Sequence, residues 1–537
     1  MARSIRYAKV TAILLTFALA LPIFTAEATL PAPELRLPEG DLRAAPANPD
    51  GIIAYKGIPY AAPPIGALRW HAPTPPLAWN GVRDASQFGN SCFSAWSEDR
   101  EPGLTRSEDC LNLNVWTGTA SNTERRPVMV WLHGGGFQFG SSASRQFEGS
   151  RLAAKGVVIV SLNYRLGVLG FLAHSELDRE GPSGNYGLQD QLAALRWVKH
   201  NIAKFGGDPA NVTLFGESAG AHAVGILMAS PQAEGLFHKA IAQSGAFWDG
   251  KDGPLETYRE AHARGEAYAR KLGVHSVAAM RALPAVEVNA AAPWDFSMIP
   301  MVSAFSPNID RYVVPAAPAA RFARGQQMRI PLLAGWVDVE EYPFDAHGLP
   351  HRNAAEFRAA AVVMFGKDRI GEFLKHYPAA TDDQANASAG ALAGDLVISE
   401  QTWQMLDWHH RRGNAVFGYK FTFTSPYTPI AAHITDVPFV FGTLTPQFII
   451  GSKVPPSGID RAFSDKVMSY WVNFAAHSDP NGPGLPIWPA YGASDVVQNL
   501  GVTIQPQAND RAGRFKFIAS YRRRGVFPMR WRPVRVR

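Results

Sequence analysis

The turn sequence FGESAG at residues 215–220 constrains the fold more than any other feature, because it sets a serine between two glycines where a strand pattern gives way to a helical one. The apolar run at 212–215 is typical of a buried strand, and the run AHAVGILMAS that follows is typical of a helix. So abrupt a turn forces its apex residue toward positive φ, and Gly216 and Gly220 let the two backbones approach. We therefore expect the Ser218 hydroxyl to stand above a sheet, beside the first N–H groups of a helix.

Strand and helix patterns alternate along much of the chain. Apolar runs bounded by turn residues predict buried strands at 128–132, 157–164, 212–215, 239–244, 330–336 and 416–423. Helical patterns lie between them, the clearest at 186–205, and such alternation is typical of a mostly parallel sheet covered on both faces. A bare G-x-S-x-G match can be only a glycine-lined turn, but in this context it predicts the α/β-hydrolase fold: a large, mostly parallel central sheet flanked by helices. The Ala-rich helical stretches 254–300 and 352–412 are expected to be insertions around an active-site gorge.

The first 28 residues have the pattern of a secretory signal. Three basic residues precede a 15-residue apolar run, and a small-x-small sequence ends at Ala28. An N-terminal membrane anchor is the alternative, but the run is shorter than the roughly 20 residues that a spanning helix needs. We therefore expect signal cleavage, export to the periplasm or the medium, and no transmembrane segment in the mature chain.

The expected export places the two cysteines, Cys92 and Cys110, in an oxidising compartment. In an oxidising compartment, two cysteines this close in sequence are expected to form one disulfide, with two unrelated buried thiols as the alternative. In the loop-entropy model such a bond restrains the unfolded chain by roughly 3 kcal/mol. No Cys/His spacing indicates a structural metal site.

A formal net charge of +6 could indicate a nucleic-acid or membrane partner, but the positive charge is concentrated at the two ends of the chain. The segment 1–28 carries +2 and the basic tail 521–537 carries +7, which leaves −3 for residues 29–520. This main body, expected to be a single α/β-hydrolase catalytic domain, is therefore not a nucleic-acid binder by charge. The tail is either an anchor for an anionic surface or a solvated terminus.

A serine hydroxyl becomes a good nucleophile when an imidazole takes its proton and a carboxylate orients that imidazole. In this fold the acid and then the histidine follow the serine in the chain, each just past a strand. Glu340 follows the 330–336 strand, with Asp338 and Glu341 near enough to compete, and His433 lies in a loop beyond the 416–423 strand. Spacing alone leaves the acid and the base open.

Six segments spread from about residue 50 to residue 491 occur in an order that resembles one known family. They are GIPYAAPPIGALRWHAPTPPLAW, SEDCLNLNVW, HGGGF, FGGDPANVTLFGESAG, FSPNID and FAAHSDPNGPGLPIWPAY. In this order they resemble the type-B carboxylesterases, the family of the cholinesterases and of bacterial esterases acting on nitrobenzyl esters. The resemblance implies a serine esterase that cleaves small-molecule carboxylic esters through an acyl-enzyme and needs no cofactor or metal.

The resemblance also assigns roles to residues. It implies three catalytic side chains, which are the nucleophile Ser218, the acid Glu340 and the base His433. It implies three main-chain donors for the oxyanion, which are Gly135, Gly136 and Ala219. The resemblance also assigns two further residues, Glu217 and Ser244, to the surroundings of the catalytic side chains. They are expected to support those side chains rather than to contact the substrate. Two departures leave loop details open: Glu341 replaces a common glycine, and the segment HITD at 433–436 differs from the family's H-G-x-E.

Two other functions compete with a simple esterase. A hydrolase of feruloyl esters, carbamates or lactones would use the same chemistry, and only the shape of the pocket would separate it. Residues expected to shape that pocket are Phe137, Trp248, Trp294 and Phe344. A non-catalytic binding domain of cholinesterase type would have lost catalytic residues, and here all of them are present. The sequence gives no indication of the oligomeric state.

Overall fold

The computed structural model describes residues 33–95, 103–118, 123–247, 255–292, 305–342, 349, 351–444 and 453–522. The chain divides into two units, Met1–Pro31 and Ala32–Arg537, and the described residues belong to the second. The signal expected at 1–28 lies outside the described residues, as do residues 523–537 of the expected tail. Among the described residues, no helix has both the length and the apolar character needed to cross a membrane.

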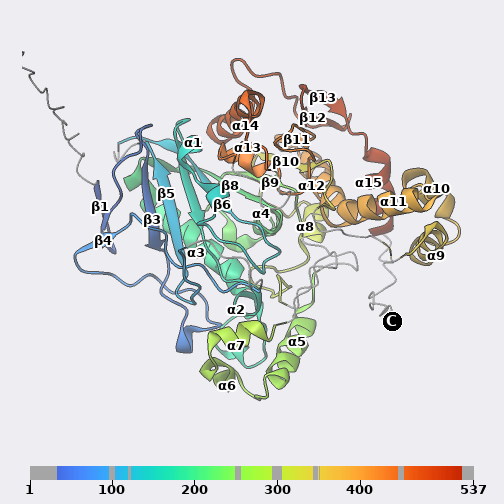
Figure 1. Ribbon diagram of the computed structural model, residues 1–537. Helices are drawn as coiled ribbons and strands as arrows, with labels where there is room; N and C mark the ends of the chain where they lie inside the picture. Colours follow the sequence, from blue (N-terminus) through green and yellow to red (C-terminus); the bar gives the residue numbers. More distant parts are fainter. Residues whose placement is uncertain are drawn as a thin grey trace, which may run out of the picture. The chain divides into compact units, whose positions relative to one another are not determined.

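A ten-stranded sheet forms the centre of the described chain (Figure 1), in the order β13-β12-β11-β10-β9-β8-β6-β7-β5-β3. The strands are β3 (Ile53–Pro59), β5 (Asn112–Thr117), β6 (Arg126–Leu132), β7 (Val158–Leu162), β8 (Gly207–Glu217), β9 (Lys239–Gln243), β10 (Leu332–Val337), β11 (Val416–Phe421), β12 (Val496–Leu500) and β13 (Ile504–Ala508). Neighbours from β12 to β7 are parallel, while β13 and the β5–β3 edge run antiparallel. The predicted mostly parallel sheet is confirmed, and the antiparallel edges are an addition. A separate small sheet joins β1 (Glu34–Leu37), β2 (Gly40–Arg43) and β4 (Val82–Asp84).

Each face of the large sheet has its own apolar core, as strand geometry requires. Along β6, Val128 and Val130 pack into one core, while Met129 and Trp131 pack into the other, because successive side chains point to opposite faces. The first core includes residues of α3 (Tyr186–Asn201) and α4 (Ala219–Met228). The second includes residues of α13 (Val437–Phe441) and α14 (Gly458–His477). Both faces are therefore covered, which explains why the parallel strands read as continuous apolar runs.

The Ala-rich stretches are helical where they are described. They contain α5 (Tyr258–Lys271), α6 (Val277–Ala282), α7 (Ala285–Ala290), α9 (Ala354–Phe365), α10 (Ile370–His376), α11 (Asp382–Gly394) and α12 (Glu400–His410). Helices α9 to α11 share a third apolar core with the C-terminal helix α15 (Ala512–Arg522), at the right of Figure 1. The boundary expected at residue 520 therefore falls inside a helix. Shorter helices are α1 (Ser150–Ala153), α2 (Gly167–Phe171) and α8 (Pro318–Arg324).

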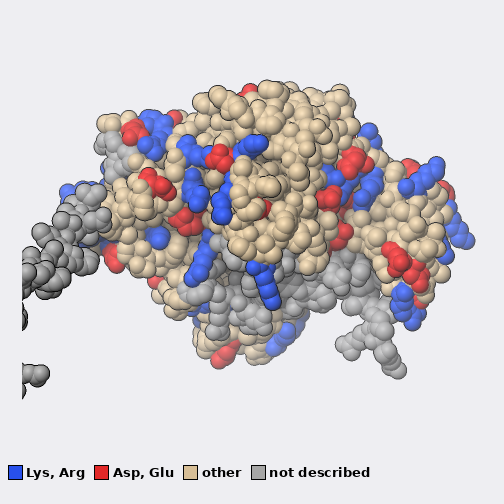
Figure 2. All heavy atoms as spheres, turned by 45° about the horizontal axis from the view of Figure 1, so that its top comes forward, with Lys and Arg blue, Asp and Glu red and all other residues tan. Residues whose placement is uncertain are grey.

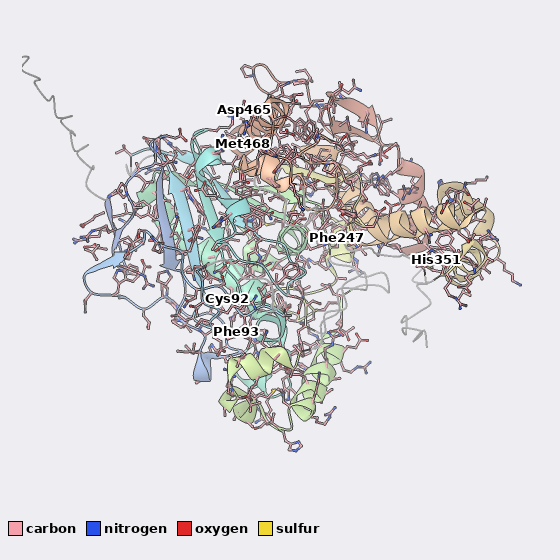
Figure 3. All side chains as sticks on the ribbon, in the orientation of Figure 1. Cys92, Phe93, Phe247, His351, Asp465 and Met468 are labelled. Carbon is pink, nitrogen blue, oxygen red and sulfur yellow. A yellow bond between two sulfur atoms is a disulfide. The ribbon has the colours of Figure 1, made fainter. Side chains whose placement is uncertain are left out.

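One helix of the Ala-rich stretches, α12, also belongs to the layer that covers the sheet. It packs on β10 and β11. Trp408 of α12 also stacks on Phe247, which is labelled in Figure 3, with ring centroids 5.6 Å apart. A helical pattern shows that a helix forms, but not which surface it packs against. A π-helical segment, Asp395–Ser399, joins α11 to α12.

The disulfide predicted between Cys92 and Cys110 is confirmed, and both residues are buried (Figure 3). Asn112, at the start of β5, fills the space beside it. Its side-chain amide donates to the main-chain oxygens of Asn90, at 2.9 Å, and Cys110, at 3.0 Å. Asn112 therefore ties the two ends of the disulfide loop together.

Charges of both signs are interspersed over the face drawn in Figure 2. Several charges of the described residues pair, as Lys155 does with Asp465 at 2.6 Å. This distribution agrees with the small net charge of the main body in the sequence.

Candidate active site

Ser218 lies at the turn between β8 and α4, as the sequence predicts. Its φ is 54°, in the left-handed region, and its side chain is buried. A Cβ on Gly216 would lie 2.6 Å from the carbonyl carbon of Gly220, and one on Gly220 would lie 2.0 Å from the main-chain oxygen of Leu132. Both glycines are therefore required by close backbone approach, and the strained serine between them is held by the elements on either side.

The glycine strip that follows β6 lies directly against this turn. The parallel pairing of β6 with β8 sets Leu132 opposite Gly216, so the residues after each strand end meet. A Cβ on Gly134 would lie 2.7 Å from Oε2 of Glu217 and 3.2 Å from Cβ of Ser218. Gly135 and Gly136 adopt φ values of 102° and 60°. The strip thus runs beside the serine in a conformation that favours glycine.

Tyr164 holds His133, the residue just before the glycine strip, through two contacts. The hydroxyl of Tyr164 donates to the main-chain oxygen of His133 at 2.8 Å, and the two rings stack with centroids 4.5 Å apart. Burial lowers the pKa of His133 to about 4, so this histidine is neutral and acts as a packing residue. Ala219 is the first residue of α4, where main-chain N–H groups have no partner within the helix.

Glu340 and His433 meet, although 93 positions separate them. Nδ1 of His433 lies 2.6 Å from Oε2 of Glu340, and the main-chain N–H of Val337 donates to Oε1 of Glu340 at 2.9 Å. Both side chains are buried. The backbones of their loops are also joined, because Val339 donates to the oxygen of Ala431 at 2.9 Å.

The two competing carboxylates face other partners. Asp338 pairs with Lys420 at 2.9 Å. Glu341 packs against the glycine face of α11, where a Cβ on Gly390 would lie 3.1 Å from its Cγ. Of the three carboxylates that the sequence left open, Glu340 is the one in contact with His433.

A second carboxylate faces the other nitrogen of the imidazole. Nε2 of His433 lies 3.2 Å from Oε1 of Glu217, the residue before Ser218. Burial would lower the pKa of His433, but the nearby carboxylates of Glu217, Glu340 and Asp436 outweigh it and raise the pKa to about 9. Burial also raises the pKa of Glu217, to about 8, against the attraction of His433. The two groups are close enough to titrate as a pair.

A polar network beside the His433 imidazole was not predicted from the sequence. Oδ2 of Asp436 accepts hydrogen bonds from the Gln243 amide and the Tyr419 hydroxyl, each at 2.9 Å. The Trp471 ring nitrogen donates to the Gln243 amide oxygen at 3.1 Å. Burial raises the pKa of Asp436 to about 6. The only signal in the sequence was the placement of Asp436 three residues after His433.

Ser244 lies alongside the serine turn, just after β9. It also has positive φ, 54°, and its N–H donates to the main-chain oxygen of Gly335 at 2.8 Å. The preceding residue, Gln243, accepts a hydrogen bond from the N–H of Ser218 at 2.9 Å. The structure thus brings Ser244 close to the backbone of the turn.

Phe137, the first of the residues expected to shape the pocket, is buried and packs edge-on against Phe171, with centroids 5.4 Å apart. The other three, Trp248, Trp294 and Phe344, lie outside the described residues. Within the described ranges, no group of three or more His, Cys, Asp and Glu side chains is arranged to hold a metal ion.

Comparisons with known proteins agree with this geometry. The model of the carboxylesterase family matches residues 32–518. A fumonisin B1 esterase of Sphingopyxis macrogoltabida is 37% identical over 464 residues, covering 84% of this chain and 83% of that protein. A para-nitrobenzyl esterase of Bacillus subtilis (strain 168) is 34% identical, covering 82% of this chain and 89% of its own length. A solved PNB esterase structure has a TM-score of 0.77 at 32% identity, covering 90% of this chain and 99% of that chain.

The family match spans nearly the whole second unit, and the solved relatives share its α/β-hydrolase fold. The relatives are named for the hydrolysis of carboxylic esters. The protein therefore belongs to the carboxylesterase family and is a carboxylic ester hydrolase.

Proposed function

We propose that this carboxylesterase is exported and cleaves small-molecule esters in two steps through an acyl-enzyme on Ser218. The observation that carries the proposal is the placement of His433, with Nδ1 at Glu340 and Nε2 at the residue preceding Ser218. The imidazole is oriented by Glu340 at Nδ1, and its Nε2 lies at the carboxylate next to a strained, buried serine. This supports a mechanism in which Nε2 takes the proton of the Ser218 hydroxyl.

In the first step, the Ser218 oxygen attacks the ester carbonyl while Nε2 of His433 takes the hydroxyl proton. Glu340 holds the proton on Nδ1 and stabilises the imidazolium that forms. The negative oxygen of the tetrahedral intermediate accepts hydrogen bonds from the N–H groups of Gly135, Gly136 and Ala219. The intermediate collapses as His433 gives the proton to the departing alcohol.

In the second step, water attacks the acyl-enzyme and His433 takes its proton. The second tetrahedral intermediate uses the same N–H donors, and its collapse returns the proton to Ser218 and releases the acid. The Glu217 carboxylate faces Nε2 and stabilises the charged imidazole during both steps. Every proton is accounted for by side chains of this chain and by water.

Substitution of the nucleophile tests the proposal. Ser218→Ala should lower kcat for p-nitrophenyl acetate by at least about 10⁴-fold, while the thermal unfolding midpoint stays within a few degrees. A neighbouring hydroxyl outside the proposed triad, removed by Thr213→Val, serves as the control for substitution in β8. Turnover retained in the Ser218 variant would refute the proposal.

The substrate is proposed at the level of simple carboxylic esters. The names of the relatives extend the choice to a fumonisin ester and to nitrobenzyl esters. A panel that varies the acyl and alcohol parts separately, with fumonisin B1, a feruloyl ester, a carbamate and a lactone included, ranks these classes by kcat/KM. We expect simple short-chain esters to have the highest values, and a preference of tenfold or more for another class would replace this assignment.

A further inference from the structure

Two buried cations hold the loop that carries Glu340. Asp338, two residues before Glu340, lies 2.9 Å from Nζ of Lys420 and 3.0 Å from Nη2 of Arg511. The same Nη2 donates to the main-chain oxygen of Asp338. The carboxylate is 44% exposed, whereas the Lys420 and Arg511 side chains are only 7% and 12% exposed. The surrounding protein therefore holds the two cations in place, and their contacts with Asp338 hold the loop.

Asp338, Val339 and Glu340 each have a different anchor. Asp338 is held by the cations, Val339 pairs with the loop of His433, and Glu340 reaches the imidazole itself. His433 in turn donates its N–H to the main-chain oxygens of Val339 and Tyr342, each at 3.2 Å. A shift of Asp338 would therefore change both the position of Glu340 and the backbone that supports His433.

Arg511 connects this loop to a distant part of the chain. It lies just before α15, and its Nη1 is 3.6 Å from Oδ1 of Asp395, in the π-helical segment between α11 and α12. Asp395 is fully buried and also pairs with Arg514 at 2.6 Å and Tyr377 at 2.8 Å. Nη1 of Arg511 thus contacts a buried ionic cluster, while Nη2 binds Asp338 in the loop that carries Glu340.

The π-helical segment also meets this loop directly. Gly394, the residue before it, has no room for a side chain, because a Cβ there would lie 2.9 Å from Cβ of Glu340. A π-turn within a helix is frequently found at a functional site. Here Asp395, the first residue of the π-helical segment, contacts Arg511, and the glycine before it lies against Glu340.

We propose that Arg511 is a positioning residue for ester hydrolysis, which sets the Glu340 carboxylate against His433 by clamping Asp338 to the Asp395 cluster. The proposal rests on the proposed function, in which Glu340 orients the base. It makes the region before the C-terminal helix part of the support of the active site. A salt bridge that only added stability would leave kcat unchanged in the folded protein.

The test compares two arginines of the same region. Arg511→Gln removes the clamp, and Arg522→Gln removes the pair with Glu400 (2.7 Å) at the other end of α15. We measure kcat and KM for p-nitrophenyl acetate, together with the thermal midpoint. Arg511→Gln should lower kcat about tenfold with KM unchanged, because the misplaced imidazole acts on the transition state and not on substrate binding. Arg522→Gln should keep kcat even if its midpoint falls further.

Conservative variants complete the design. Arg511→Lys keeps a cation near Asp338 and should recover most of the lost kcat. Asp338→Asn breaks the same contact from its exposed side and also weakens the pair with Lys420, so it should lower kcat similarly. The loss in the double variant should be smaller than the product of the two single losses, since the contact between Arg511 and Asp338 is common to both. This second variant keeps the test decisive if Arg511→Gln does not fold.

The outcomes separate the two proposals. Wild-type kcat in both Arg511→Gln and Asp338→Asn, or equal losses of kcat in Arg511→Gln and Arg522→Gln, would overturn the clamp. If Ser218→Ala is inactive in the same assay, such a result leaves the esterase mechanism standing. Turnover by Ser218→Ala would instead refute the mechanism itself, whatever the arginine variants do.

Discussion

His433 has a carboxylate at each of its nitrogens, and the two carboxylates have different consequences. Glu340 at Nδ1 fixes the ring, whereas Glu217 contacts Nε2, the nitrogen that takes the Ser218 proton in the proposed mechanism. A negative charge at that position favours the charged imidazole, which helps the transition state but reduces the fraction of neutral base in the free enzyme. Glu217 therefore sets the pH range in which the base is ready.

Glu217→Gln tests this role. In the proposed mechanism hydrolysis needs neutral His433, so kcat/KM should rise with pH through the His433 pKa. The Glu217 carboxylate raises that pKa. Its removal should therefore move the rising limb of the pH profile to lower pH by about one unit. The limb is measured from kcat/KM for p-nitrophenyl acetate between pH 5 and 10, with Glu217→Asp, which keeps the charge, as the control. An unmoved limb, or one moved to higher pH, would contradict the role.

At the scale of elements, the site exists because three strand ends meet. β6, β8 and β10 supply the glycine strip, the serine turn and the Glu340 loop, and their parallel register brings these ends to one edge of the sheet. The close approach of β6 to α4 leaves no space at Gly220, whose missing Cβ would face backbone rather than a movable side chain. The packing of α4 against the end of β6 thus links the position of the serine turn to that of the glycine strip.

Gly220→Ala should therefore damage stability and activity together. The added methyl would meet the Leu132 main-chain oxygen, and we expect the free energy of unfolding to fall by about 2 kcal/mol. Gly371→Ala, in α10 with open space around it, is the matched control: it should leave kcat/KM unchanged and should not lower the free energy of unfolding, which helix propensity would raise by up to about 1 kcal/mol. Chemical denaturation and kcat/KM provide the two readouts. Wild-type stability in the Gly220 variant would show that the backbone there is not fixed as described.

The sequence predicted the parallel strands and the Ser218 turn because local patterns determine them. It missed β3, β5, β12 and β13, the strands nearest the two edges of the sheet. The edge strand β13, with Pro506 and partly exposed polar residues, has no apolar pattern. The hydrogen bond from Gln243 to Asp436 joins positions 193 residues apart, and no local signal specifies such a pair. Spacing alone left Glu340 and Asp338 open, and the family resemblance favoured Glu340; the contacts of Asp338 with Lys420 and Arg511 come only from the folded chain.

For the molecule as a whole, the proposed export makes a prediction about the mature chain. The buried disulfide agrees with an oxidising compartment, since such bonds are rare in the cytosol. Protein recovered from the periplasm or the medium should begin at Thr29, and Cys92 and Cys110 should react with a thiol reagent only after reduction. N-terminal sequencing and intact mass before and after reduction measure this. A chain that keeps Met1, or two free thiols in the native protein, would contradict export.

The most direct test of the account is to observe the acyl group on the enzyme. With excess p-nitrophenyl acetate at low pH and millisecond mixing, the enzyme should release p-nitrophenol in a burst approaching one equivalent per active site, and the quenched protein should carry one acetyl group on the peptide containing Ser218. An acetyl group on another residue, or hydrolysis that proceeds with neither burst nor adduct under conditions where deacylation is slow, would contradict it.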